Sequence, residues 1–248
     1  GCMRGRPADR VLASAPTPVE LTRTGARYQP NVDGYVLREY PWLSFIAGRF
    51  ARVPFISGTN RDEGTVFTLG ATIADEAAYR MRVAALLPDR VDDVLRLYPV
   101  SMFPTPKDAF NAFLADAVFT CPARAQARLV AAQNLPTYLY RFTRLNRGAS
   151  ALGLGVFHSA ELAYVFGNFT GFFSRGDGDD AVVAATQGYW TRFAATGDPN
   201  GGGAPMWPAF TRDGDMHLEI GDMVTTGSGL RRDKCDAMES WLAPPAGM

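Results

Sequence analysis

The chain has 248 residues, of which 47% are hydrophobic and 20% charged, a balance that supports a buried core and excludes the low hydrophobicity of disordered proteins. Its 25 basic and 25 acidic residues give a formal net charge of zero, and no cluster of lysines and arginines is present, so we do not expect nucleic acid as a partner. No apolar run is long enough to predict a membrane span.

The first half of the chain predicts one strand followed by two long helical stretches. Residues 53–57 form an apolar, β-rich run typical of a strand. Residues 75–98 carry apolar side chains at helical spacing, and Pro88 should divide this stretch into two helices because proline interrupts helical hydrogen bonding. Residues 108–133 predict a further long helix, interrupted or kinked near Pro122.

The second half predicts a strand at residues 137–142, a helix, and a strand at residues 216–220. The helix should begin near Asp179 and Asp180, because acidic residues suit a helix N-terminus, and end before Gly197, which suits a left-handed C-cap. Its core-facing stripe consists of Val183, Gln187, Trp190 and Phe193. Strands alternating with helices predict the α/β class, with a largely parallel sheet covered on both faces.

Two short motifs carry candidate functional residues. Gly-Thr-Asn-Arg-Asp-Glu-Gly occupies residues 58–64, after the first predicted strand, and Phe-His-Ser-Ala-Glu-Leu occupies residues 157–162, after the second. Each motif alone also fits an ordinary interpretation, since Asp-Glu-Gly is common turn chemistry and a lone histidine beside an aromatic residue is more often packed or exposed. His217, the only other histidine, lies in the third predicted strand and is interpreted as a partly exposed strand residue.

Both motifs, in this order, resemble the acid and histidine signatures of the type-B carboxylesterase and cholinesterase family, whose triad runs Ser, Glu, His along the chain. Further matching segments are residues 32–34, 53–58, 138–142, 193–200 and 207–210. The resemblance implies an α/β-hydrolase fold, with residues 1–248 as the C-terminal part of a single carboxylesterase catalytic domain. No Gly-x-Ser-x-Gly is present, so the nucleophile would lie in an N-terminal half upstream of Gly1, and that half would be a partner of this chain. We expect no cofactor and no metal, since the acidic loop at residues 175–180 lacks the glutamate that an EF-hand calcium loop needs near its twelfth position.

The resemblance also assigns roles to three residues. His158 would be the general base, and Glu63 would hold its imidazole in the correct tautomer. Glu161 would order polar groups behind them, although a capping or surface role is a rival. The substrate would be a carboxylic ester, hydrolysed through an acyl-enzyme. The alternative function is a non-catalytic, cholinesterase-like adhesion or binding domain, which the presence of both Glu63 and His158 disfavours.

Three further residues are expected near the substrate. Phe67, four residues after Glu63, matches an aromatic residue that lines the gorge of cholinesterases. Thr24 and Ala26 fall where acetyl-selective relatives carry bulky aromatic residues, so the resemblance implies a roomier acyl pocket. Ser159 occupies a position that is often glycine in the family.

The resemblance pairs Cys121 with Cys235 in a disulfide that ties a C-terminal helix to the body, whereas the residues alone also allow three buried reduced thiols. Cys2 would pair with a cysteine upstream of the chain. Asp116 and Arg231 resemble a family ion pair beside the disulfide, although two unrelated solvated charges are an alternative. A disulfide indicates an oxidising compartment, so the expected location is secreted or periplasmic.

Overall fold

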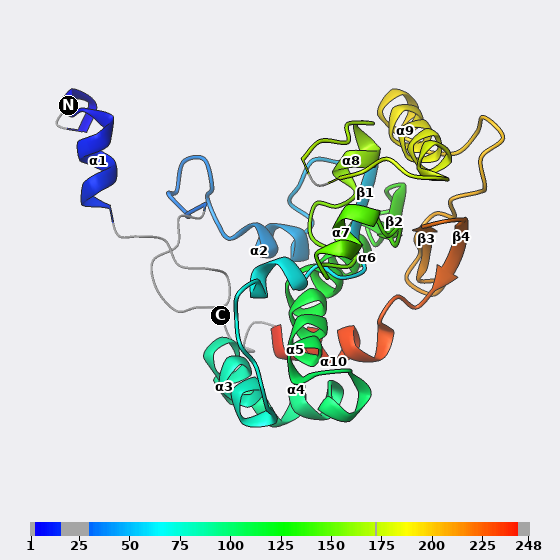
Figure 1. The fold of residues 1–248 in the computed structure, drawn as a ribbon. Coiled ribbons are helices and arrows are strands. Elements are labelled where there is room, and N and C mark those ends of the chain that lie inside the picture. Colours follow the sequence, from blue (N-terminus) through cyan, green and yellow to red (C-terminus); the bar gives the residue numbers. More distant parts are fainter. Residues whose placement is uncertain (1–2, 16–29, 172, 243–248) are drawn as a thin grey trace.

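The computed structural model describes residues 3–15, 30–171 and 173–242 (Figure 1). The strands are β1 (Phe55–Asn60), β2 (Thr137–Phe142), β3 (Met216–Ile220) and β4 (Val224–Ser228). The helices are α1 (Ala8–Ser14), α2 (Pro41–Ile46), α3 (Glu76–Leu86), α4 (Val91–Leu97), α5 (Pro106–Ala115), α6 (Cys121–Ala131), α7 (Arg147–Ala151), α8 (Leu162–Val165), α9 (Asp179–Thr196) and α10 (Arg232–Leu242). A π-helical turn, Asp116–Thr120, joins α5 to α6, and 3-10 turns cover Met3–Gly5, Thr65–Thr68, Pro88–Arg90 and Val100–Met102. None of the helices in these ranges is long and apolar enough to cross a membrane.

The four strands form one mixed sheet in the order β1-β2-β3-β4. β1 pairs with β2 in parallel along its whole length, from Phe55 opposite Thr137 to Asn60 opposite Phe142. β2 pairs with β3 in parallel, and β4 returns antiparallel along β3. The predicted fold class, a mostly parallel sheet flanked by helices, is therefore confirmed.

Two strands occupy the predicted residues, a third is displaced, and a fourth is not predicted by the sequence. The displaced strand is β1, which runs from Phe55 to Asn60 instead of over residues 53–57. It begins after Pro54 because this proline has no N–H to donate to a neighbouring strand. β4 has the sequence Val-Thr-Thr-Gly-Ser, which is polar and contains glycine, so it lacks a strand signature of its own. A tight turn in which the N–H of Gly221 donates to the carbonyl of Met223 brings β4 beside β3.

Helices cover both faces of the sheet. On one face α6 lies against β1 and β2, and Ala123 and Ala127 pack with Leu139. On the other face α8 and α9 cover a core that contains the fully buried Trp207, whose Nε1 donates a hydrogen bond to the carbonyl of Leu139 at 3.0 Å. In Figure 1, α9 (yellow) lies above the strands, and α5 and α6 (green) lie below them.

Prolines interrupt the helices where the sequence predicts. α3 ends at Leu86 and α4 begins at Val91, so the stretch is divided around Pro88. The second predicted helix is interrupted by the π-helical turn, in which the N–H of Cys121 donates to the carbonyl of Asp116, five residues earlier. Pro122 follows directly and has no N–H to donate, so regular α-helical bonding cannot continue through this point.

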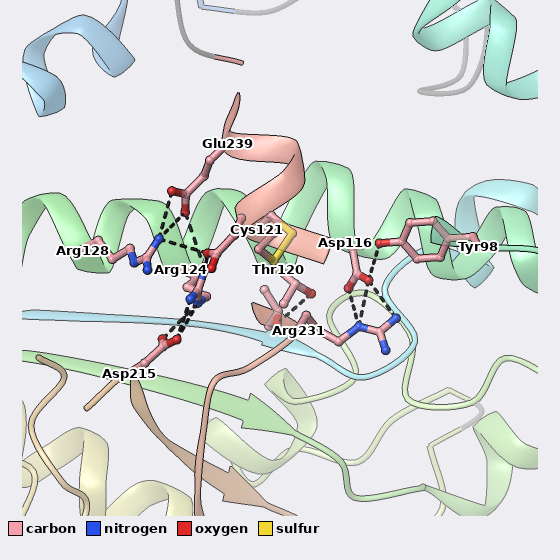
Figure 2. The surroundings of a disulfide bond; sticks show 12 residues. Tyr98, Asp116, Thr120, Cys121, Arg124, Arg128, Asp215, Arg231 and Glu239 are labelled. Carbon is pink, nitrogen blue, oxygen red and sulfur yellow. Dashed lines mark hydrogen bonds and ion pairs between the residues drawn. A yellow bond between two sulfur atoms is a disulfide. The ribbon is translucent and has the colours of Figure 1, made fainter. Parts of the chain in front are cut away.

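A second core lies among α3, α4, α5 and α10 and contains a disulfide. Cys121 and Cys235 are bonded, with Cα atoms 4.9 Å apart, so the predicted pairing is confirmed (Figure 2). Beside it, Nε of Arg231 donates to both carboxylate oxygens of Asp116 at 2.8 and 3.1 Å, and the Tyr98 hydroxyl donates to the same carboxylate at 2.7 Å. The C-terminal helix α10 is thereby tied to the long α5–α6 segment by a covalent bond and by an ion pair.

Candidate active site

Glu63 lies in the turn that follows β1 and is almost fully buried, with 4% of the residue exposed. The backbone N–H of Asn60, the last residue of β1, donates to Glu63 Oε1 at 2.7 Å. Burial raises the pKa of the Glu63 carboxyl, whereas the hydrogen bonds from Asn60 and His158 act in the opposite direction. The carboxylate is therefore held in one position by the backbone of its own turn.

His158 meets Glu63 across a sequence separation of 95 residues. Its Nδ1 lies 2.7 Å from Glu63 Oε2, the distance of a strong hydrogen bond. β1 and β2 are parallel neighbours, so the segments that follow them leave the sheet at the same edge and can converge. The His158 side chain is 43% exposed, and its Nε2 makes no hydrogen bond to any residue that the structure describes. Glu63 thus orients the His158 imidazole through Nδ1, and Nε2, which no described residue bonds, can accept a proton.

Asp62 fixes the loop that carries His158 to the turn that carries Glu63. The Asp62 N–H donates to the carbonyl of Val156 at 2.9 Å, and the N–H of Val156 donates to Asp62 Oδ2 at 2.8 Å. Gly155, with φ +64°, lies so close that an added Cβ would be 2.4 Å from Asp62 Oδ2. The acidic turn and the histidine loop therefore form one hydrogen-bonded unit.

Glu161 is joined to the same unit by Asn60, a residue to which the sequence assigns no role. Asn60 Nδ2 donates to the carbonyl of Phe157 at 2.9 Å and also to the Glu161 carboxylate. Ser159, between the histidine and Glu161, has φ +72°, a conformation that favours glycine and that explains why glycine would suit this position. In the sequence, the only indication that Asn60 belongs to the site is that it lies in the same short motif as Glu63.

Aromatic rings flank the imidazole. The centroid of Phe67 lies 5.3 Å from that of His158, and the centroid of Phe119 lies 4.8 Å away. The two phenylalanine rings also stack on each other at 5.6 Å. Phe119 belongs to the π-helical turn, and no pattern in the sequence indicates it. Thr24 and Ala26, the other two predicted pocket residues, lie outside the described residues.

His217, the other histidine, lies on β3 and is not part of the site around Glu63 and His158. The sequence interpretation of a partly exposed residue is wrong, because the residue is 6% exposed. The unpredicted strand β4 covers it, and its ring lies against Gly227, where an added Cβ would be 2.5 Å from Cε1. Burial lowers the pKa of His217, and its Nδ1 is buried without a hydrogen-bond partner. Among the residues that the structure describes, no cluster of His, Cys, Asp and Glu could hold a metal ion.

Comparison with known proteins identifies the family. Residues 1–238 match the model of the carboxylesterase family. The chain belongs to the carboxylesterase family. As a carboxylesterase-family chain it has the α/β-hydrolase fold, of which the mixed sheet and its flanking helices are the described part.

This carboxylesterase-family chain is similar to several curated esterases. It is 30% identical to the fumonisin B1 esterase of Sphingopyxis macrogoltabida over 81% of the chain and 38% of that protein. It is 27% identical to acetylcholinesterase 1 of Caenorhabditis elegans over 86% of the chain and 41% of that protein. It is 26% identical to a secreted lipase of Arthroderma benhamiae over 91% of the chain and 43% of that protein. The chain spans about two fifths of the length of these relatives.

Proposed function

We propose that this chain supplies the acid and the base of a carboxylic ester hydrolase with a Ser-Glu-His triad. Glu63 orients the imidazole and stabilises its protonated form, and His158 is the general base. The 2.7 Å contact between Glu63 Oε2 and His158 Nδ1 carries the proposal, because it leaves Nε2 free to take a proton from a hydroxyl. Esters are the substrate class that the family implies.

The reaction follows from the open imidazole nitrogen. His158 Nε2 takes the proton of a serine hydroxyl while the serine oxygen bonds to the carbonyl carbon of the ester. The tetrahedral intermediate then expels the alcohol, which receives that proton from His158. A water molecule repeats the step on the acyl-serine, releasing the carboxylic acid and restoring the serine. Glu161, held through Asn60, positions the backbone around His158, and Phe67 and Phe119 form an apolar wall beside it.

The nucleophile and the oxyanion hole come from another segment, because the chain contains no Gly-x-Ser-x-Gly. Residues 1–248 then form the C-terminal part of one catalytic domain, and the N-terminal half is the partner that completes it. Within the described residues β1 pairs only with β2, so its other edge is available for a further strand. The chain's coverage of about two fifths of its relatives agrees with this division.

The disulfide supports a secreted or periplasmic location. Bonds such as that between Cys121 and Cys235 persist in oxidising compartments and are rare in the cytosol. One relative is itself named a secreted lipase.

The test joins this chain to an N-terminal carboxylesterase segment that carries Gly-x-Ser-x-Gly and measures hydrolysis of p-nitrophenyl butyrate. In the joined protein, His158→Ala should lower kcat by about 10⁶-fold and Glu63→Gln by about 10⁴-fold, as in other serine hydrolase triads. His217→Ala, which removes the other histidine, is the matched control and should change kcat by less than about threefold.

The chain alone should show no turnover above the buffer rate. Turnover by the chain alone that depends on His158 would place a nucleophile within these 248 residues and contradict the proposed division. A folded joined protein that leaves p-nitrophenyl butyrate intact would favour the alternative function, a non-catalytic adhesion or binding domain.

A further inference from the structure

A second cavity lies behind the turn that carries Glu63. It has a volume of about 370 Å³, and its lining includes Arg61 and Thr65 of that turn, Arg141 of β2, and Arg231. Neither Glu63 nor His158 lines it. The cavity adjoins the candidate active site through Asp62 but contains neither the acid nor the base, so an inference about it goes beyond the proposed function.

Two of the three arginines that line the cavity already have partners. Nε of Arg61 lies 3.0 Å from Asp62 Oδ2. Arg231 forms the ion pair with Asp116 at 2.8 Å that Figure 2 shows. In each of these two pairs the carboxylate compensates the charge of the arginine, so the remaining charged groups of the lining are Arg141 and Asp108.

The Arg141 side chain is half-buried, and its guanidinium has no hydrogen bond or ion pair with any residue in the described ranges. It stands opposite Thr59 on β1 and Glu219 on β3, yet no carboxylate oxygen of a described residue lies within 4.0 Å of its guanidinium. Burial lowers the pKa of Arg141, and the charge of Glu219 opposes this shift. A guanidinium carries five N–H donors, and leaving them unpaired in a partly buried place is costly.

We propose that this cavity binds a small monocarboxylate, which accepts a forked pair of hydrogen bonds from Arg141. A planar guanidinium matches the two oxygens of a carboxylate, and the interaction is strong because both groups are charged. The apolar side chains of Phe103, Ala112 and Ala115 line the same cavity and can cover a short alkyl chain.

The surrounding carboxylates disfavour an anion with more than one negative charge. Of the three arginines in the lining only Arg141 has no ion-pair partner within 4.0 Å among the described residues, while the carboxylates of Asp62, Asp108 and Asp116 also line the cavity. Asp108 is bonded to the Thr105 hydroxyl and has no cationic partner among the described residues. A dianion such as phosphate would be repelled by these carboxylates more strongly than a singly charged acid.

The first experiment measures binding of sodium butyrate to the whole chain by isothermal titration calorimetry at low ionic strength. Arg141→Gln should weaken binding by at least about 10-fold, since it removes a charged, two-bond contact. Arg80→Gln is the matched control, because Arg80 is exposed and paired with Asp92 elsewhere on the surface. It should leave the affinity unchanged. Inorganic phosphate should bind more weakly than butyrate, and butylammonium should not bind.

A second measurement uses the unaltered chain, so it does not depend on how a variant folds. Phenylglyoxal labels accessible guanidinium groups, and peptide mass spectrometry reports the label on Arg141. Butyrate should protect Arg141 and leave the labelling of Arg80 unchanged. Equal weakening in both variants, unchanged labelling of Arg141 with saturating butyrate, or tighter binding of phosphate than of butyrate would each overturn the proposal.

Discussion

Arg124 of α6 is fully buried on the side of the sheet that α6 covers. Carboxylates surround its guanidinium. The side chain is 0% exposed, and its Nε donates to both oxygens of Asp215 at 3.0 and 3.2 Å. Its Nη1 donates to Asp236 on α10 at 2.7 Å, and Figure 2 shows Arg124 pointing toward Asp215. A buried ion pair adds little net stability, but removing one partner leaves the other charge buried without compensation.

We therefore expect Arg124→Met to lower the free energy of unfolding by about 3 to 5 kcal/mol, measured by urea denaturation. Arg80→Met is the control, because the Arg80–Asp92 pair is exposed and should be worth less than about 1 kcal/mol. A similar loss in both variants would show that the burial of Arg124 does not set the cost.

His217 should make stability depend on pH. Its pKa lies below the ordinary value of 6.5 because of burial, so between 6.5 and the native pKa the unfolded chain binds a proton that the native chain does not. The contribution of neutral His217 to the free energy of unfolding is therefore fully present above pH 6.5. It is lost as the pH falls from 6.5 through the native pKa of His217. NMR of the two histidine rings should show His217 titrating below pH 6.5.

His217→Gln provides the comparison, because glutamine does not titrate. The unaltered chain should lose more stability than this variant between pH 7 and pH 5, measured by urea unfolding. A midpoint for His217 at or above 6.5 would contradict the burial seen in the structure.

At the scale of elements, the end of α9 depends on the absence of a side chain at Gly197. This residue has φ +78°, and its N–H donates to the carbonyl of Phe193 at 2.7 Å. An added Cβ would be 2.7 Å from Cγ of Pro54, the residue before β1. The glycine therefore ends the helix and also allows α9 to approach the start of β1.

Gly197→Ala should destabilise the chain by more than the roughly 1 to 2 kcal/mol that a left-handed backbone costs a residue with a Cβ. Gly203→Ala is the matched control, because Gly203 has φ +74° but no atom within 4 Å of an added Cβ. Urea unfolding of the two variants separates the backbone cost from the contact with Pro54. Equal losses would mean that Pro54 moves aside at no cost.

At the scale of the whole molecule, the disulfide joins parts of the chain that are 114 residues apart. In the chain-entropy model a loop of this length stabilises the native state by about 4 to 5 kcal/mol, because it restricts the unfolded chain. The double substitution Cys121→Ala with Cys235→Ala should lower the free energy of unfolding by about this amount. Both cysteines are buried, and alanine has no polar side-chain atom, so the double substitution leaves no unpaired polar group in the core.

Reduction of the unaltered chain with dithiothreitol should bring its urea midpoint close to that of the double variant. Peptide mapping without reductant should recover Cys121 and Cys235 in one linked fragment. A double variant as stable as the oxidised chain would show that the bond forms without contributing to the stability of the fold.

The sequence by itself determined the features that depend on neighbouring residues. Pro88 and Pro122 mark the helix interruptions because a missing N–H acts locally, and Gly197 marks the end of α9 because a left-handed turn needs glycine. The motifs around Glu63 and His158 are also local, but the roles of these residues came only through the family resemblance, because each motif alone fits an ordinary turn or a packed histidine. The pairing of Cys121 with Cys235 came only through the family resemblance, since spacing alone leaves the connectivity open.

Only the tertiary structure decided which distant groups meet. The register of β1 against β2 brings Glu63 to 2.7 Å from His158, and the π-helical turn brings Phe119 beside the same imidazole. β4 exists because β3 offers it a partner, and its presence buries His217. These outcomes depend on how strands pair and helices pack across long stretches of chain, and a pattern within a few residues carries no information about such contacts.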